Sequence, residues 1–179
     1  MKDLRELMAY SLSDYDISMF FRGEINIIAF KNLKDFKSID DVLGKYERCI
    51  ILIEGNESNH WVMVQKIRIK NRKPYILFWD SYGLIPENEF NYIPKSFTLM
   101  SGQEKGSLIK LLINQPLPVH YSQYRLQQLK DGINTCGRWC CIKALYPDIT
   151  EDRFDKLMRA TDYTPDELIT LLYEDINNE

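Results

Sequence analysis

The stretch GINTCGRWCC, residues 132–141, contains three of the four cysteines in the chain. Asn134 and Thr135 are residues that commonly precede helices, and the spacing of the apolar residues after them predicts a helix over residues 135–145. Cys136 would then lie in the first turn, where unpaired N–H groups and the positive end of the helix dipole favour a thiolate. Three interpretations of this stretch compete: a metal site, a disulfide framework, or a nucleophile with buried neighbours.

The spacing of the other candidate ligands gives little support to the first two interpretations. Zinc sites draw their ligands from two closely spaced pairs, whereas Cys136 and Cys140 form one pair and the histidines His60 and His120 stand apart. A disulfide between the neighbours Cys140 and Cys141 would be strained. We therefore expect free thiols, no bound metal and no cofactor, with Cys140 and Cys141 as buried structural residues.

The composition is that of one ordinary globular domain. The chain has 179 residues, 45% hydrophobic and 27% charged, with no repeat or linker, so we expect a single domain over residues 1–179. The net charge of −3 does not support a nucleic-acid-binding surface, which would be basic. Residues 1–10 lack the apolar core of a signal peptide, and no apolar run approaches the ~20 residues that span a bilayer. These features predict a soluble protein in a reducing compartment, without a membrane partner.

The order of predicted elements is typical of an α+β fold, with a small mixed sheet flanked by helices. Ser13 and Asp16 have capping-box spacing, and Thr164-Pro165-Asp166-Glu167 is a strong helix start. The pattern predicts helices over residues 1–8, from 13, around 40–43, and over 105–114, 135–145, 152–159 and 165–173. It predicts strands over residues 49–54, 60–70, 74–80 and 117–121, with a hairpin turn at 71–73.

A catalytic cysteine needs a base, usually a histidine, and an acid that orients that base. His60 follows the polar loop of residues 55–59 and opens a predicted strand, a position where catalytic groups often lie. Asp80 ends the second strand of the hairpin, which returns it toward His60, in proximity rather than in contact. His120 is a rival base, but no acid stands at a matching strand end. A surface histidine and a turn-capping aspartate are the simpler readings of His60 and Asp80.

Three motifs in this order resemble those of the adenovirus-protease and Ulp1-type cysteine peptidases. They are HW at residues 60–61, FWDSYG at 78–83 and TCGRWC at 135–140; LSDYDI at 12–17 is similar to the opening of adenain-like chains. The similarity covers roughly residues 11–145. It implies a papain-like, adenain-like fold, with His60 as base, Asp80 as its orienter and Cys136 as nucleophile.

The resemblance also implies an oxyanion donor and a narrow substrate channel. The family places a glutamine six or seven residues before the cysteine, whereas Gln127 and Gln128 lie nine and eight before Cys136, so either could serve. Trp61 corresponds to the tryptophan that covers the substrate backbone in the family and favours cleavage next to glycine, although strand alternation puts it on the face opposite His60. Gly137 has no side chain, so a substrate backbone could approach the nucleophile closely.

The resemblance therefore implies a thiol endopeptidase that cleaves viral structural (capsid) precursors, in the host cytoplasm or the virion. The TCGRWC motif and the near-minimal chain favour the branch of large DNA viruses, virophages and related transposons. One alternative is an isopeptidase that acts on ubiquitin-like or SUMO conjugates. The other is a binding domain that keeps the fold without catalysis. Adenain uses DNA and a peptide as activators; here the acidic charge does not support DNA, and no cysteine is evidently free to bind the peptide.

Overall fold

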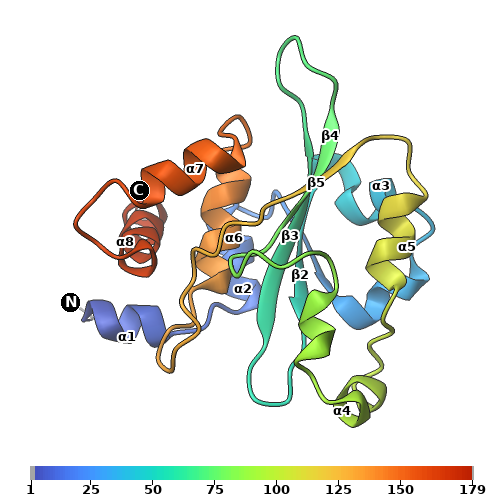
Figure 1. The fold of residues 1–179 in the computed structure, drawn as a ribbon, viewed down its shortest axis with the longest axis horizontal. Helices are drawn as coiled ribbons and strands as arrows, with labels where there is room; N and C mark the ends of the chain where they lie inside the picture. Colours follow the sequence, from blue (N-terminus) through green and yellow to red (C-terminus); the bar gives the residue numbers. More distant parts are fainter. Residues whose placement is uncertain (1–2, 179) are drawn as a thin grey trace.

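The computed structural model of the chain describes residues 3–178, which form a five-stranded mixed sheet between two layers of helices (Figure 1). The strands lie side by side in chain order: β1 (Asn26–Ala29), β2 (Arg48–Ile53), β3 (His60–Ile67), β4 (Tyr75–Trp79) and β5 (Val119–Tyr121). β2, β3 and β4 are antiparallel, whereas β1 and β5 join the two edges in parallel. The predicted α+β class, with a small mixed sheet flanked by helices, is confirmed.

The two faces of the sheet carry separate cores because successive side chains of a strand point to opposite faces. In β3, Trp61 and Met63 pack with α6, while Val62 and Val64 pack in a second cluster on the other face. The helices on the first face are α1 (Leu4–Ala9), α2 (Asp14–Phe20), α6 (Cys136–Leu145), α7 (Glu151–Met158) and α8 (Pro165–Asn177). The other side carries α3 (Ile39–Leu43), α4 (Lys95–Met100), α5 (Ser107–Ile113) and the 3-10 segments η1 (Phe30–Asp35), η2 (Gly44–Tyr46) and η3 (Asn88–Asn91).

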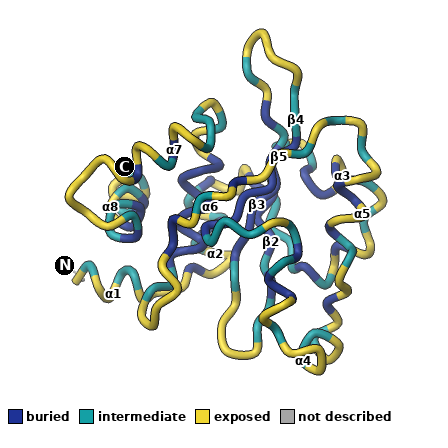
Figure 2. The backbone as a smooth tube through the Cα atoms, viewed as in Figure 1, coloured by how far each residue is buried: buried dark blue, intermediate teal, exposed yellow. Residues whose placement is uncertain are grey.

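α6 is the central helix of the molecule. Every residue from Cys136 to Ala144 is buried, and Figure 2 shows the buried helix beside the buried sheet. The burial includes Arg138, which donates to the Tyr10 carbonyl, and Lys143, which donates to the Ile149 carbonyl. A helix enclosed on all sides has a fixed position, so the residue that begins it is held firmly.

The helix starts predicted at Ser13 and Thr164 are confirmed. The Ser13 and Asp16 side chains each bond to the backbone N–H of the other, which makes a capping box. Thr164 and Glu167 form the same arrangement at the start of α8, with Pro165 as the first helical residue. The first predicted helix begins at Leu4; residues 1–2 of that prediction lie outside the described part of the chain.

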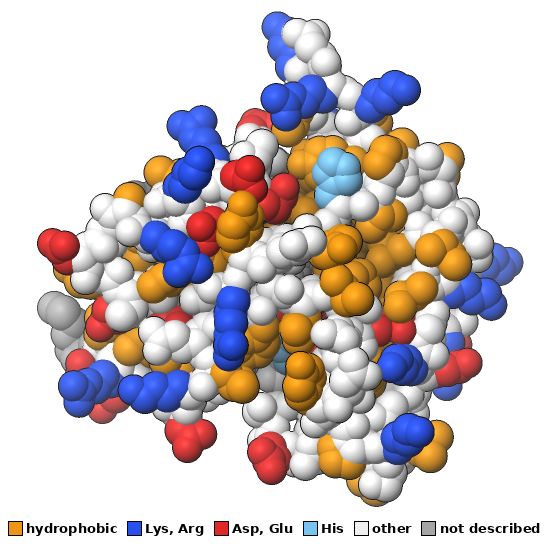
Figure 3. Space-filling model, in the orientation of Figure 1, with side chains coloured by type: hydrophobic (Ala, Val, Ile, Leu, Met, Phe, Trp, Pro, Cys, Tyr) orange, Lys and Arg blue, Asp and Glu red, His pale blue; other side chains and the backbone are white. Residues whose placement is uncertain are grey.

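The hairpin of β3 and β4 is also confirmed, but its connection is longer than predicted. The paired residues run from Met63 opposite Trp79 to Ile67 opposite Tyr75, so residues 68–74 form the loop that protrudes from the sheet (Figure 1). Lys and Arg side chains are spread over the face in Figure 3 without forming one basic patch. Among residues 3–178, no helix has the length and apolar character needed to cross a membrane.

Candidate active site

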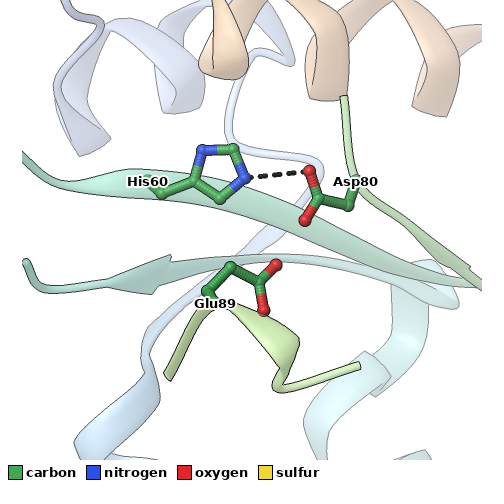
Figure 4. A group of neighbouring side chains, drawn as sticks. All are labelled: His60, Asp80 and Glu89. Atoms are coloured by element: carbon green, nitrogen blue, oxygen red, sulfur yellow. Dashed lines mark hydrogen bonds and ion pairs between the residues drawn. The ribbon is translucent and has the colours of Figure 1, made fainter. Parts of the chain in front are cut away.

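His60 and Asp80 meet at one end of the sheet. His60 begins β3 and Asp80 follows the last residue of β4; the His60 Nε2 lies 3.0 Å from the Asp80 Oδ1 (Figure 4). Continuing the register past Met63 and Trp79 puts Asp80 opposite Val62, so Asp80 is a diagonal neighbour of His60 on the same face. The sequence predicted proximity without contact, and the structure corrects this prediction: the two side chains are hydrogen-bonded.

The turn after β4 holds the Asp80 carboxylate in place. Asp80 is fully buried, and its Oδ1 also accepts the Tyr82 backbone N–H at 2.7 Å. Gly83 closes the turn by donating to the Asp80 carbonyl, with φ at +70°, where a Cβ would lie only 2.8 Å from the Gln123 carbonyl oxygen. Asp80 therefore caps a turn that requires glycine and bonds to His60 at the same time.

Cys136 lies beside His60 and belongs to the layer of helices that contains α6. It is the first residue of α6, and only 3% of it is exposed. Burial by itself would lower the pKa of His60, but the charge of Asp80 and hydrogen bonds with Asp80 and Cys136 outweigh it and hold the pKa well above its usual range. The imidazole is thus arranged to carry a positive charge beside the thiol.

The other three cysteines have a different environment. Cys49, Cys140 and Cys141 are fully buried in the apolar cores, and none of the four forms a disulfide. Burial raises the pKa of each of these three thiols. They stay uncharged at neutral pH, which makes them poor nucleophiles.

Glu89 is a neighbour of this group that the sequence did not indicate. It lies in η3 and approaches from the opposite layer; its carboxylate, Asp80 and the His60 ring each contribute an atom to a group within 4.8 Å (Figure 4). Burial and the nearby Asp80 carboxylate raise the pKa of Glu89 to about 9. Burial would also raise the pKa of Asp80, but His60, Glu89 and the Tyr82 N–H lower it.

A histidine and two carboxylates are also side chains of the types that ligate divalent ions. However, His60 Nε2 and Asp80 Oδ1 already bond to each other, so an ion would have to displace that hydrogen bond.

Of the two candidate glutamines, the structure brings Gln127 to the site. Gln127 is buried, and its Nε2 donates to the Tyr82 hydroxyl at 3.1 Å, while the Tyr82 ring stacks on His60 at 4.8 Å between centroids. The Ser81 hydroxyl donates to the Gln127 Oε1 at 2.7 Å, so the turn that holds Asp80 also holds this amide. Gln128 is exposed and uses its backbone N–H to bind Asp166.

Trp61 and Gly137 pack against each other. The Trp61 indole is 3% exposed and donates to the Leu12 carbonyl at 2.9 Å. A Cβ on Gly137 would lie 3.1 Å from the Leu12 Cβ and 3.2 Å from the Trp61 Cδ1, so the missing side chain lets α6 approach β3. Gly137 thus has a packing role at this contact, and close approach of a substrate backbone there stays a prediction. Trp61 also lines a cavity of about 330 Å³, together with Leu12 and Asn59.

Asp166 is a second residue whose role the sequence did not reveal. It was expected only as an acid in the first turn of α8, but it is fully buried. It accepts hydrogen bonds from the Gln128 N–H, the Thr135 hydroxyl and the Trp139 indole N–H. One carboxylate therefore joins the start of α8 to the start of α6 and to the segment that carries Gln127.

His120 lies away from this arrangement. It is an exposed residue of the edge strand β5, opposite Leu77, and its ring stacks on Tyr75. The structure thus brings together Cys136, His60, Asp80 and Gln127 from the predicted set, adds Glu89, and leaves His120 and Gln128 outside.

Comparison with known proteins finds a relative from a virophage. No family model matches it. The chain is 33% identical over 177 residues to the uncharacterized protein V9 of Sputnik virophage, an alignment that covers 96% of this chain and 99% of the relative. The chain belongs to the family of this virophage V9 protein.

Proposed function

We propose that this protein is a cysteine endopeptidase with a papain-like fold of the adenain type. Cys136 is the nucleophile, His60 the general base and Asp80 the acid that orients the base. The observation that carries the proposal is the hydrogen-bonded chain from Asp80 through the His60 ring to the thiol at the start of α6. The other three thiols lack any such partner set among the described residues, since they lie in apolar cores.

The first step is formation of the nucleophile. Because Nε2 of His60 bonds to Asp80, Nδ1 is the ring nitrogen left to take the proton from Cys136 Sγ. The raised pKa of His60 keeps that proton on the imidazole at neutral pH. The first turn of α6 adds unpaired N–H groups that stabilise the thiolate.

The second step is acyl transfer. The thiolate attacks the carbonyl carbon of the scissile peptide, and the carbonyl oxygen gains a negative charge. The Cys136 N–H and the Gln127 side-chain amide stabilise this oxyanion by donating hydrogen bonds to it. The Gln127 amide is already held by Tyr82 at 3.1 Å and by the Ile133 carbonyl at 3.4 Å; the longer bond is the one a substrate would replace. His60 then protonates the departing amine, which leaves a thioester on Cys136. Water, deprotonated by His60, attacks the thioester carbon; the carbon–sulfur bond breaks, the acid is released, and the Cys136 thiolate is restored beside the protonated imidazole.

The proposed substrates are structural precursor proteins of a virus, cleaved in the host cytoplasm or the virion. Membership in a virophage protein family supports a viral setting. Cleavage next to glycine is proposed because Trp61 is fixed by its bond to Leu12 beside the site, and a rigid indole wall admits a backbone without Cβ atoms most readily.

A peptide library made from a whole proteome tests the activity and the specificity together. We expect the purified wild-type protein to cut the library, with glycine enriched at the residue before the cut. Cys136→Ala should lose all measurable cleavage while it keeps its circular dichroism spectrum. Cys140→Ala is the matched control in the same helix, and it should lose stability, by about 1–3 kcal/mol for a small buried deletion, but keep the chemistry.

Two further reagents separate the alternatives. A ubiquitin-like precursor that is processed faster than any library peptide would favour the isopeptidase. A thiol-directed probe that fails to label Cys136 in a folded, inert protein would favour a binding domain. Wild-type turnover by Cys136→Ala would contradict the cysteine mechanism.

A further inference from the structure

The site contains two buried carboxyl groups side by side. Asp80 is fully buried and Glu89 is 6% exposed, and one oxygen of each lies with a His60 nitrogen inside the 4.8 Å group (Figure 4). They come from different elements, since Asp80 follows β4 and Glu89 belongs to η3. Their closeness is not required by local chain geometry, so it needs a chemical reason.

Two ionised carboxylates at this separation, both out of water, would repel each other strongly. His60 is the cation of the group, and its Nε2 bonds to one of the two, through the Asp80 Oδ1. One carboxyl group must therefore hold a proton, because the second negative charge has no cation to itself among the described residues that surround it.

The hydrogen-bond pattern assigns the proton to Glu89. The Asp80 Oδ1 accepts hydrogen bonds from the His60 ring and from the Tyr82 backbone N–H, and both bonds favour the ionised form of Asp80. Both Glu89 oxygens and the Asp80 Oδ2 are buried, and within residues 3–178 none of these three atoms has a partner at ordinary hydrogen-bond distance. Buried polar atoms rarely lack a hydrogen-bond partner. A protonated Glu89 could donate a hydrogen bond to the Asp80 Oδ2 and so satisfy both groups. Burial and the charge of Asp80 raise the pKa of Glu89 to about 9, in agreement with this assignment.

We propose that Glu89 is a positioning residue, which in its neutral form donates a hydrogen bond to the Asp80 Oδ2 and so keeps Oδ1 directed at His60. It acts through Asp80 and touches neither substrate nor thiol. The titratable groups that face it are Asp80 at the end of β4 and His60 on β3, with Cys136 on α6 and Tyr82 in the turn beyond them. The catalytic part of this inference rests on the proposed function; the protonation of Glu89 does not.

Carboxyl-carbon NMR on the Cys136→Ala protein tests the protonation without any need for activity. The Glu89 signal is the one that Glu89→Gln removes, and we expect it to titrate above pH 7. Glu87→Gln is the matched control, because Glu87 is also buried but accepts backbone N–H groups of residues 106, 108 and 109 at the start of α5. A Glu89 signal that titrates near the ordinary value of about 4.3 would overturn the proposal.

The imidazole N–H signal of His60 tests the positioning. The chain has two histidines, so the signal can be assigned by comparison with His120→Gln. We expect Glu89→Gln, whose amide can still donate to Asp80, to keep the downfield N–H signal of a His–Asp hydrogen bond. Glu89→Leu, of similar size but without a donor, should lose or shift it. Identical His60 spectra in the Gln and Leu variants would overturn the proposal, and so would Zn²⁺ binding that shifts His60 and Glu89 together at stoichiometric concentration.

Peptide cleavage then tests the consequence. Glu89→Leu should lower kcat by about 10- to 100-fold, the effect of one hydrogen bond to a charged group, with KM little changed. Glu89→Gln should stay within a few-fold of the wild type. A wild-type protein that cleaves nothing would defeat the proposed function and leave the NMR result standing, whereas normal kcat in Glu89→Leu would defeat the positioning role alone.

Discussion

His60 and His120 differ in what surrounds each ring, and this difference predicts which one acts as the base. His60 bonds to Asp80 and the Cys136 thiol, whereas His120 is exposed and stacks on Tyr75. His60→Ala should lower kcat/KM for peptide cleavage by about 10²–10⁴-fold, the usual value of a positioned base. His120→Ala should behave as wild type. Equal losses in the two variants would show that the contact with Asp80 has no catalytic meaning.

Gln127 and Gln128 allow a second comparison between neighbours. Gln127 is buried between Ser81 and Tyr82, and Gln128 points its side chain to solvent. Gln127→Ala should lower kcat by about 10²–10³-fold, as for the loss of one oxyanion donor. Gln128→Ala should leave kcat unchanged, and its stability is the reference against which the stability of Gln127→Ala is compared. A large loss in Gln128→Ala with normal kcat in Gln127→Ala would move the oxyanion site elsewhere.

At the residue scale, the sequence predicted those side chains that belong to ordered motifs. His60 begins β3, Asp80 directly follows β4 and Cys136 begins α6, and all three lie in motifs of a known order. Their proximity was therefore predictable, whereas the hydrogen bond between His60 and Asp80 was not. Glu89 was not, because it follows a loop with no motif and reaches the site from the opposite core. The choice between Gln127 and Gln128 depends on how the loop before Cys136 folds, which spacing alone does not reveal.

At the scale of elements, Asp166 links the starts of α6 and α8, and the contribution of this link to the free energy of unfolding can be measured. Asp166→Ala would leave the Gln128 N–H, the Thr135 hydroxyl and the Trp139 indole N–H without their acceptor. We expect it to lower the free energy of unfolding by about 3 kcal/mol or more, since each unpaired buried donor costs about 1–3 kcal/mol.

Asp166→Asn should cost less, because the amide oxygen still accepts. Glu167→Ala is the control in the same helical turn: it removes only the capping box, worth about 1 kcal/mol. Urea unfolding measures all three variants. A larger loss in Glu167→Ala than in Asp166→Ala would mean that the helix cap, and not the buried link, stabilises this corner.

The elements that the sequence missed are those that depend on distant partners. β1 has four residues, and it is a strand because Asn26–Ala29 pair with residues 49–52 of β2. α4 is short, and none of its residues is buried, so no apolar stripe marks it in the sequence. Helices with capping signals of their own, such as α2 and α8, were predicted well because their starts are local.

At the scale of the whole molecule, the order of helices and strands was enough to predict the class but not the closeness of the two layers at the site. The site lies at one end of the sheet, where Cys136 comes from the first core and η3 from beside the second. Whether two such groups touch depends on the packing of both layers against the sheet, which is a property of the complete fold.

Proton binding at this sheet end should appear in the stability of the entire protein. The pKa of His60 is raised, so its contribution to the free energy of unfolding is complete below about pH 6.5, its unfolded value. It is lost as the pH rises through the higher folded value. The contribution of Glu89 to the free energy of unfolding is also lost as the pH rises. The loss begins near pH 4.3, its unfolded value, and is complete above its folded pKa of about 9. The pKa of Asp80 is lowered, so its contribution is present above about pH 3.9 and is lost as the pH falls below that.

The wild-type protein should therefore become less stable between pH 6.5 and 9, as measured by urea unfolding under reducing conditions. Glu89→Gln should flatten this dependence across the range, and His60→Gln should flatten it as well, because each removes one of the two groups that hold protons in the fold. His120→Gln should leave the slope as in the wild type, since that ring is exposed at the sheet edge. If His120→Gln removed as much of the slope as His60→Gln, the proton would have to be bound at β5, and the hydrogen-bonded chain from Asp80 to Cys136 would lose its thermodynamic support.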